Sequence, residues 1–163
     1  MRLIPNVCSP SGNCRQVAES AQASVSRLCR GVLSRPVGET GIVILIDAAN
    51  VVGSRPNGWW RDRPGAARAF VERVRAAVGA GRLAEPVVVV LEGAARGGVE
   101  TGVADGVTVL HAPGSGDDML IAVTADAASQ VTLVSADRVL RQRAEALGAD
   151  VAGPGWLIDL LDR

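Results

Sequence analysis

Acidic side chains follow four short apolar runs of this sequence, close to the point where each run ends. Wholly apolar runs separated by helical patterns are typical of buried parallel strands, whose carboxyl ends meet at one edge of the sheet. Carboxylates that meet there repel one another unless a cation lies between them, and oxygen ligands suit Mg²⁺ or Mn²⁺. The pattern therefore predicts a site for one of these ions. The acidic residues are Asp47, Glu92, Asp117, Asp118 and Asp137, and the runs are 42–46, 87–91, 107–110 and 131–134.

The first two acidic positions, Asp47 and Glu92, each have a structural alternative to a catalytic role. An aspartate at the end of a buried strand is costly unless its charge has a partner. Asn50 follows Asp47 on the same turn, where it could orient a water molecule or contact a phosphate. The alternative is that Asp47 only caps the next segment through its backbone amides. Glu92 is either a metal ligand or the partner of Arg96 in an ion pair.

The later aspartates stand where helices are predicted to begin. Negative charge is favourable at a helix N-terminus, so capping alone would explain either Asp117 or Asp118. Two adjacent aspartates after a glycine-rich turn favour metal binding, although neighbours on a helix point about 100° apart and need not act alike. Ser135 is as good a helix cap as Asp137, which leaves Asp137 available for catalysis.

The apolar pattern predicts an α/β domain in which strands and helices alternate. Apolar residues at spacings of three and four indicate the helices, with Pro64 near the start of one and glycines at the ends. Alternation in this order gives a three-layer α/β/α sandwich with a mostly parallel central sheet. The predicted strands are 42–46, 87–91, 107–110, 131–134 and 149–152, the helices are 64–79, 117–128, 136–147 and 156–161, and the loops include 51–62 and 93–102.

Residues 1–40 lack this pattern and are predicted to be an N-terminal extension to a domain that spans 41–163. Within the extension, 15–33 is either an amphipathic helix or disordered, and it could bind a protein partner or a second copy of the chain. All three cysteines lie there, and they are expected to be free thiols of a reducing compartment. The sequence contains no stretch of about 18 apolar residues. We therefore expect a soluble, cytoplasmic protein without membrane contact.

The predicted loop after Asp47 combines arginine with tryptophan. Arginine suits phosphate groups, and indole rings suit the stacking of single-stranded bases. The alternative is that the tryptophans pack against the following helix. A formal net charge of zero, with seventeen basic and seventeen acidic residues, excludes bulk electrostatic binding of nucleic acid but allows such a local patch. The candidate RNA contacts are Arg55, Trp59, Trp60, Arg61, Arg63 and, beside Asp137, Arg138.

Three motifs in this order resemble the NYN domain of the PIN-like nuclease superfamily, over about residues 41–162. They are Asp47-x-x-Asn50-Val51, Gly116-Asp117-Asp118-x-Leu120 and Ser135-x-Asp137-Arg138. The resemblance implies a PIN-like fold and a metal-dependent ribonuclease with an acidic pocket that binds Mg²⁺ or Mn²⁺. Asp47, Asp117 and Asp137 match the family's acidic positions, Asn50 its polar companion, and Asp118 an additional acid of some members. Ala48 stands where the family often has glycine, and Glu92 where it often has aspartate.

The favoured hypothesis is hydrolysis of single-stranded RNA by Asp47, Asn50, Asp117, Asp118 and Asp137, with Glu92 as a further metal ligand. A metal-dependent phosphatase or nucleotide hydrolase could use the same residues, although the sequence lacks an Asp-x-Asp nucleophile motif. A catalytically silent RNA-binding module is the third alternative. It would bind RNA in the presence of a chelator and cleave nothing.

Overall fold

The computed structural model describes residues 41–56 and 58–163, which form one six-stranded sheet with helices on both faces. The strand order is β3-β4-β2-β1-β5-β6. All neighbouring pairs are parallel except β3 with β4. The predicted three-layer sandwich with a mostly parallel sheet is therefore confirmed. The strands are β1 (Ile42–Asp47), β2 (Val87–Leu91), β3 (Gly102–Ala104), β4 (Val107–His111), β5 (Gln130–Val134) and β6 (Asp150–Ala152).

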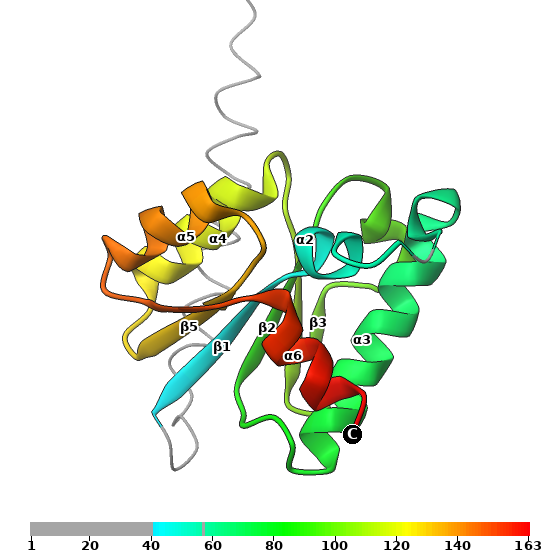
Figure 1. The fold of residues 1–163 in the computed structure, drawn as a ribbon, viewed down its shortest axis with the longest axis horizontal. Coiled ribbons are helices and arrows are strands. Elements are labelled where there is room, and N and C mark those ends of the chain that lie inside the picture. Colours follow the sequence, from blue (N-terminus) through cyan, green and yellow to red (C-terminus); the bar gives the residue numbers. More distant parts are fainter. Residues whose placement is uncertain (1–40, 57) are drawn as a thin grey trace, which may run out of the picture.

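Helices cover both faces of the sheet (Figure 1), with α4 and α5 on one face and α2, α3 and α6 on the other. The alternation of side chains along β1 divides the core between these faces, because successive residues of a strand point to opposite sides. Val43 and Leu45 pack with α4 and α5, whereas Ile44 and Ile46 pack with α2, α3 and α6. The helices are α2 (Ala48–Gly53), α3 (Arg63–Gly79), α4 (Gly116–Asp126), α5 (Arg138–Glu145) and α6 (Pro154–Leu161).

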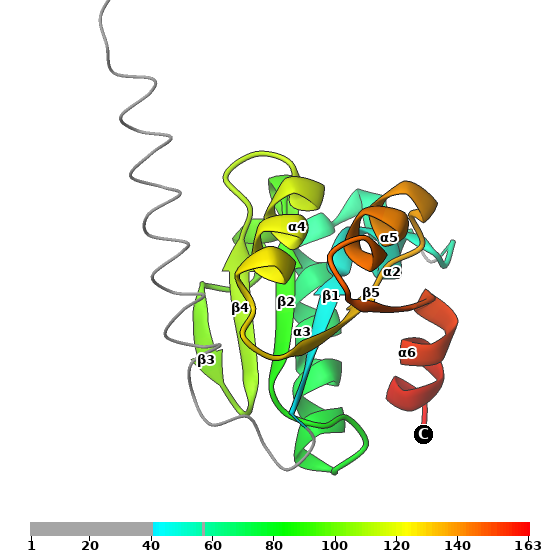
Figure 2. The same cartoon turned by 90° about the vertical axis from the view of Figure 1, so that its left-hand side faces the viewer.

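The order of the strands reverses beside β1. From β1 the chain moves to β2 and then outward to β3 and β4, and afterwards it returns to place β5 on the other side of β1 (Figure 2). In open α/β sheets, ligands bind outside the carboxyl ends of the strands at such a switch point. Asp47 ends β1, and Asp137 lies three residues beyond the end of β5. The fold therefore places these two aspartates at its most favourable position for a ligand.

The structure corrects two of the predicted loops. The predicted loop 51–62 contains the second half of α2 and a 3₁₀ turn at Trp59–Arg61. The loop 93–102 contains a 3₁₀ helix, Gly93–Gly98, before the antiparallel edge strand β3. Both errors have the same cause, because segments of one or two turns are too short to show a period.

The predictions for the helices are close to the structure, and α3 is the best of them. It begins one residue before the predicted start, where Asp62 accepts a hydrogen bond from the backbone N–H of Gly65 (2.9 Å). Among the described helices, none is long and apolar enough to cross a membrane. The predictions for 1–40, including the helix at 15–33 and the three free cysteines, lie outside the described residues.

The sheet core offers a direct test of the fold. Leu133 has no exposed surface and pairs with Leu45 in the register of β5 and β1. Leu133→Ala should lower the free energy of unfolding by about 2–5 kcal/mol, because the cavity it leaves can close only in part. Val139→Ala, at a side chain that is 66% exposed, should change it by no more than about 0.5 kcal/mol. Urea denaturation measures both, and equal losses in the two variants would contradict this core.

Candidate active site

Asp47 is buried at the carboxyl end of β1, where it is only 5% exposed. Its Oδ1 accepts a hydrogen bond from the backbone N–H of Asn50 (3.1 Å), so the aspartate does cap α2. Its Oδ2 accepts from Asn50 Nδ2 (2.6 Å) and from Ser135 Oγ (2.7 Å). These donors offset the cost of burying the charge. Because a carboxylate has about four acceptor positions, three bonds leave Asp47 able to bind one more partner.

Ser135 joins the ends of β1 and β5. Its hydroxyl donates to Asp47 and accepts from the backbone N–H of Asp137 (3.0 Å). Asp137, rather than Ser135, caps α5, because its Oδ1 accepts from the backbone N–H of Leu140 (2.8 Å). The interpretation of Ser135 as an equivalent cap was therefore wrong. Ile46 pairs with Val134 in the sheet, so Asp47 and Ser135, which come next in the two segments, are neighbours. The sequence analysis did not name Ser135 as a partner of Asp47, and the register of β5 against β1 is the feature that identifies it.

Glu92 links the end of β2 to the start of α4. Its Oε2 accepts a hydrogen bond from the backbone N–H of Gly116 (2.8 Å). A Cβ at position 116 would lie 2.7 Å from the same oxygen, so a larger residue there would displace the carboxylate from this position. Arg96 donates instead to the carbonyl oxygens of Gly93 (3.1 Å) and Ala112 (3.4 Å). The carboxylate of Glu92 is thus directed toward α4 rather than paired with Arg96.

Asp117, in the first turn of α4, is influenced by the negative charges of the other carboxylates at this edge. Its pKa is raised above the ordinary value, first by burial and then by the negative charges of Asp47, Asp137 and Glu92. Arg143 has the opposite influence on this pKa. Asp47, Glu92, Asp117 and Asp137 therefore share one electrostatic neighbourhood, which we call the acidic cluster.

The oxygen donors of the acidic cluster suit Mg²⁺ or Mn²⁺ in kind. As the side chains lie, however, no three acidic, histidine or cysteine residues within 41–56 and 58–163 are grouped closely enough to hold a metal ion. The hydrogen bonds explain this spacing. Asp47, Glu92 and Asp137 are each held by donors from a different part of the fold. The ligand roles of these residues stay predictions, and binding would require side-chain rotations toward Asp117.

Asp118, next to Asp117 in the first turn of α4, is exposed on the surface of this helix. Its side chain is 77% exposed and forms an ion pair with Arg143 (3.4 Å). Exposed pairs of this kind contribute about 0–1 kcal/mol to stability. The predicted catalytic role of Asp118 thus has less structural support than that of Asp117.

The sequence left open whether the two neighbouring tryptophans pack against the protein or present their rings to solvent, and the structure shows one of each. Trp59 is half-buried, and its indole lies where a Cβ at Gly53 would touch it (3.4 Å). The guanidinium of Arg63 lies 5.1 Å from the centre of the Trp59 ring, a cation–π contact. Trp60 is 53% exposed and meets Trp59 edge to face, with ring centres 6.4 Å apart. Trp59 therefore packs against α2, and Trp60 presents its ring to solvent.

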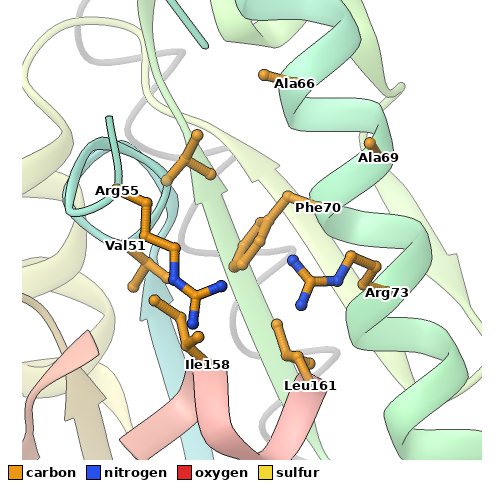
Figure 3. A pocket seen from close by; sticks show the side chains of 9 residues that line it. Val51, Arg55, Ala66, Ala69, Phe70, Arg73, Ile158 and Leu161 are labelled. Atoms are coloured by element: carbon orange, nitrogen blue, oxygen red, sulfur yellow. The ribbon is translucent and has the colours of Figure 1, made fainter. Parts of the chain in front are cut away.

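The arginines predicted to contact RNA differ in their exposure and in whether they form ion pairs within the protein. Arg55 forms an ion pair with Asp162 (2.9 Å), which Arg73 also contacts. Arg55 and Arg73 reach the mouth of a pocket of about 130 Å³ between α2, α3 and α6 (Figure 3). Arg61 and Arg138 are exposed. The proposed RNA contacts stay predictions for all of these arginines, and the bond to Asp162 leaves Arg55 less available than Arg61 or Arg138.

Comparison with known proteins identifies a fold and no family. No family model matches the sequence, and no curated protein matches it. The structure is similar to a crystal structure of a point mutant of Rae1 (YacP) from Bacillus subtilis, with a TM-score of 0.55. The two share 15% sequence identity, and the match covers 74% of each chain. The likeness shows the fold alone.

The raised pKa of Asp117 predicts a particular dependence of stability on pH. The folded state holds the proton of Asp117 more tightly than the unfolded state, so its contribution is fully present below the ordinary pKa of 3.8. That contribution is lost as pH rises through the raised pKa of the folded state. Asp117→Asn, which carries no charge at any pH, should therefore gain stability relative to the parent protein as pH rises from 3.8.

Urea denaturation between about pH 3 and 8 with a chelator present measures this difference. Asp118→Asn is the matched control, because it lies in the same first turn of α4 but is exposed. Parallel pH profiles for Asp117→Asn and the parent protein would show that Asp117 is not under this electrostatic strain.

Proposed function

We propose that this protein is a metal-dependent ribonuclease that hydrolyses phosphodiester bonds of single-stranded RNA at the acidic cluster. The observation that carries the proposal is the placement of Asp47 at the end of β1 and of Asp137 just beyond β5, beside the strand-order reversal, with Glu92 after β2 and Asp117 at the start of α4. The pKa of Asp117, raised first by burial and then by the charges of the other three carboxylates, supports it. Perturbed pKa values produced by burial and like charges are typical of functional sites. The fold, with its strand-order reversal beside β1, supports a ligand at the same edge.

Asp47, Asp117 and Asp137 would hold Mg²⁺ or Mn²⁺, with Glu92 as a further ligand. The ion would orient the attacking water and stabilise the charge that develops on the phosphate oxygens. Asn50 and Ser135 act through Asp47, whose carboxylate they fix by hydrogen bonds of 2.6 and 2.7 Å. We assign both a positioning role, since ligand orientation depends on such outer partners. Arg61, Arg63 and Arg138 would contact the RNA backbone.

The order of the three sequence motifs supports this function, because it resembles that of NYN domains. The structural likeness to Rae1 supports the fold that such a domain requires. Together they favour a nuclease over a nucleotide hydrolase that would use the same carboxylates.

Asp137→Asn separates catalysis from folding. Asparagine caps helices about as well as aspartate does, so α5 should keep its cap and the melting temperature should change little. Loss of a ligand should nevertheless lower Mn²⁺-dependent RNA cleavage by more than the roughly 10–100-fold that outer partners contribute. The measurement is cleavage of labelled single-stranded RNA with Mn²⁺, Mg²⁺ or a chelator.

Asp126→Asn is the control for this experiment, because Asp126 is exposed at the far end of α4. Full activity of Asp137→Asn would remove Asp137 from the site. Release of phosphate from free nucleotides, with intact RNA, would favour a nucleotide hydrolase. RNA binding in a chelator without any cleavage would favour a silent binding module.

Trp60→Ala tests the exposed indole as a stacking platform. One base stacked on an aromatic ring contributes about 1–3 kcal/mol to binding, so RNA affinity should fall by that amount. The melting temperature should stay nearly unchanged, because the ring is 53% exposed. Trp156→Ala, at another exposed tryptophan on α6, is the matched control. Unchanged affinity for single-stranded RNA in Trp60→Ala would exclude Trp60 from the interface.

A further inference from the structure

A pocket of about 90 Å³ opens between α2, the start of α3 and the end of β2. Its lining is mostly small and apolar, with alanines such as Ala49 and Ala66 on the two helices. One wall is the indole of Trp59, and the charged groups are the guanidinium of Arg63 and the carboxylate of Glu92. Small apolar walls, one aromatic ring and a few polar groups are the usual composition of a site for a small ring system.

The walls of this pocket are held in place by contacts that do not involve a ligand. Trp59 packs beside Gly53, where a Cβ would meet its ring at 3.4 Å, and Arg63 lies over the same ring. Glu92 is fixed by the backbone N–H of Gly116 at 2.8 Å. A preorganised site loses less entropy when it binds a ligand.

Glu92 connects the pocket with the acidic cluster. Glu92 is one of the residues that line the pocket, and its charge also contributes to the raised pKa of Asp117, so the two sites are neighbours. The base of a nucleotide whose phosphate lay at the cluster would be within reach of the pocket.

We infer that the pocket binds one base of the RNA beside the cleaved phosphate and selects guanine through the carboxylate of Glu92. This inference rests on the proposed ribonuclease function with Asp47, Asp117 and Asp137 as the metal ligands, and it assigns Glu92 to the base in place of the metal. An ionised carboxylate only accepts hydrogen bonds. The Watson–Crick edge of guanine presents two N–H donors side by side, which match the two oxygens. Uracil presents one N–H between two carbonyl oxygens, which a carboxylate repels.

Fluorescence of Trp59 measures base binding without any cleavage. The chain has three tryptophans, so Trp60→Phe and Trp156→Phe together leave Trp59 as the reporter. Titration with guanosine and uridine monophosphates in a chelator should give a preference for the guanine nucleotide of about tenfold or more, the usual size of discrimination by a two-bond base contact. Equal affinities for the two nucleotides would overturn the inference.

Glu92→Gln in this background should bring the ratio of the two affinities close to one. The glutamine oxygen can still accept from Gly116, which leaves an NH₂ group facing the donors of guanine. Glu72→Gln, at an exposed glutamate on α3, is the matched control and should keep the preference. An unchanged preference in Glu92→Gln would overturn the role of Glu92.

Ala49→Leu provides a second variant, because it fills the pocket and leaves Glu92 intact. It should weaken binding of the guanine nucleotide while the melting temperature stays close to that of the parent protein. Guanine binding that is undiminished in this folded variant would place the base elsewhere.

Cleavage of an RNA pool of random sequence with Mn²⁺ separates this inference from the function on which it rests. Cuts enriched next to guanine would support both. Cuts without base preference would overturn the base pocket and leave the ribonuclease. Guanine-selective binding with no cleavage of any RNA would support the pocket and refute the ribonuclease.

Discussion

The buried carboxylate of Asp47 is the constraint on which the candidate site depends. A charge at this depth is tolerated only with hydrogen-bond donors around it, and α2 and β5 provide them through Asn50 and Ser135. The same bonds fix the direction of α2 after β1 and hold the end of β5 beside it. One side chain therefore connects the central strand, a helix and the strand across the topological switch point.

The four carboxylates of the acidic cluster repel one another, and hydrogen bonds hold three of them in place. Asp47, Glu92 and Asp137 are stabilised individually by hydrogen bonds. The pKa of Asp117 is raised first by burial and then by the charges of these three carboxylates. Three of the stabilising donors are backbone N–H groups in the first turns of helices, those of Asn50, Gly116 and Leu140, where negative charge is favourable. Such an arrangement is typical of a site that exchanges some stability for function. The apolar core on both faces of the sheet supplies the stability that this exchange requires.

Glu92 belongs to both parts of the proposed site, the acidic cluster and the pocket. On one side it contacts the start of α4 and influences Asp117; on the other it lines the pocket formed with α2, α3 and Trp59. Glu92 follows β2, the neighbour of β1 in the sheet, and contacts α4 of one face while it lines a pocket with α2 and α3 of the other. Phosphate chemistry and base recognition could thus meet within one nucleotide.

The residue pattern alone determined the main strands of this protein and the positions of the acids that follow them. Tertiary contacts decided where the side chains of the site point. The strand 87–91 and the positions of the acids after the strands followed from wholly apolar runs, because only buried parallel strands tolerate them. Sequence could not separate Trp59 from Trp60, since packing against Gly53 buries one of two adjacent rings and leaves the other exposed. Nor could it pair Ser135 with Asp47, 88 residues apart, because that bond depends on the register of β5 against β1. Local pattern fixes which residues reach an edge, whereas contacts between distant segments fix the direction of each side chain there.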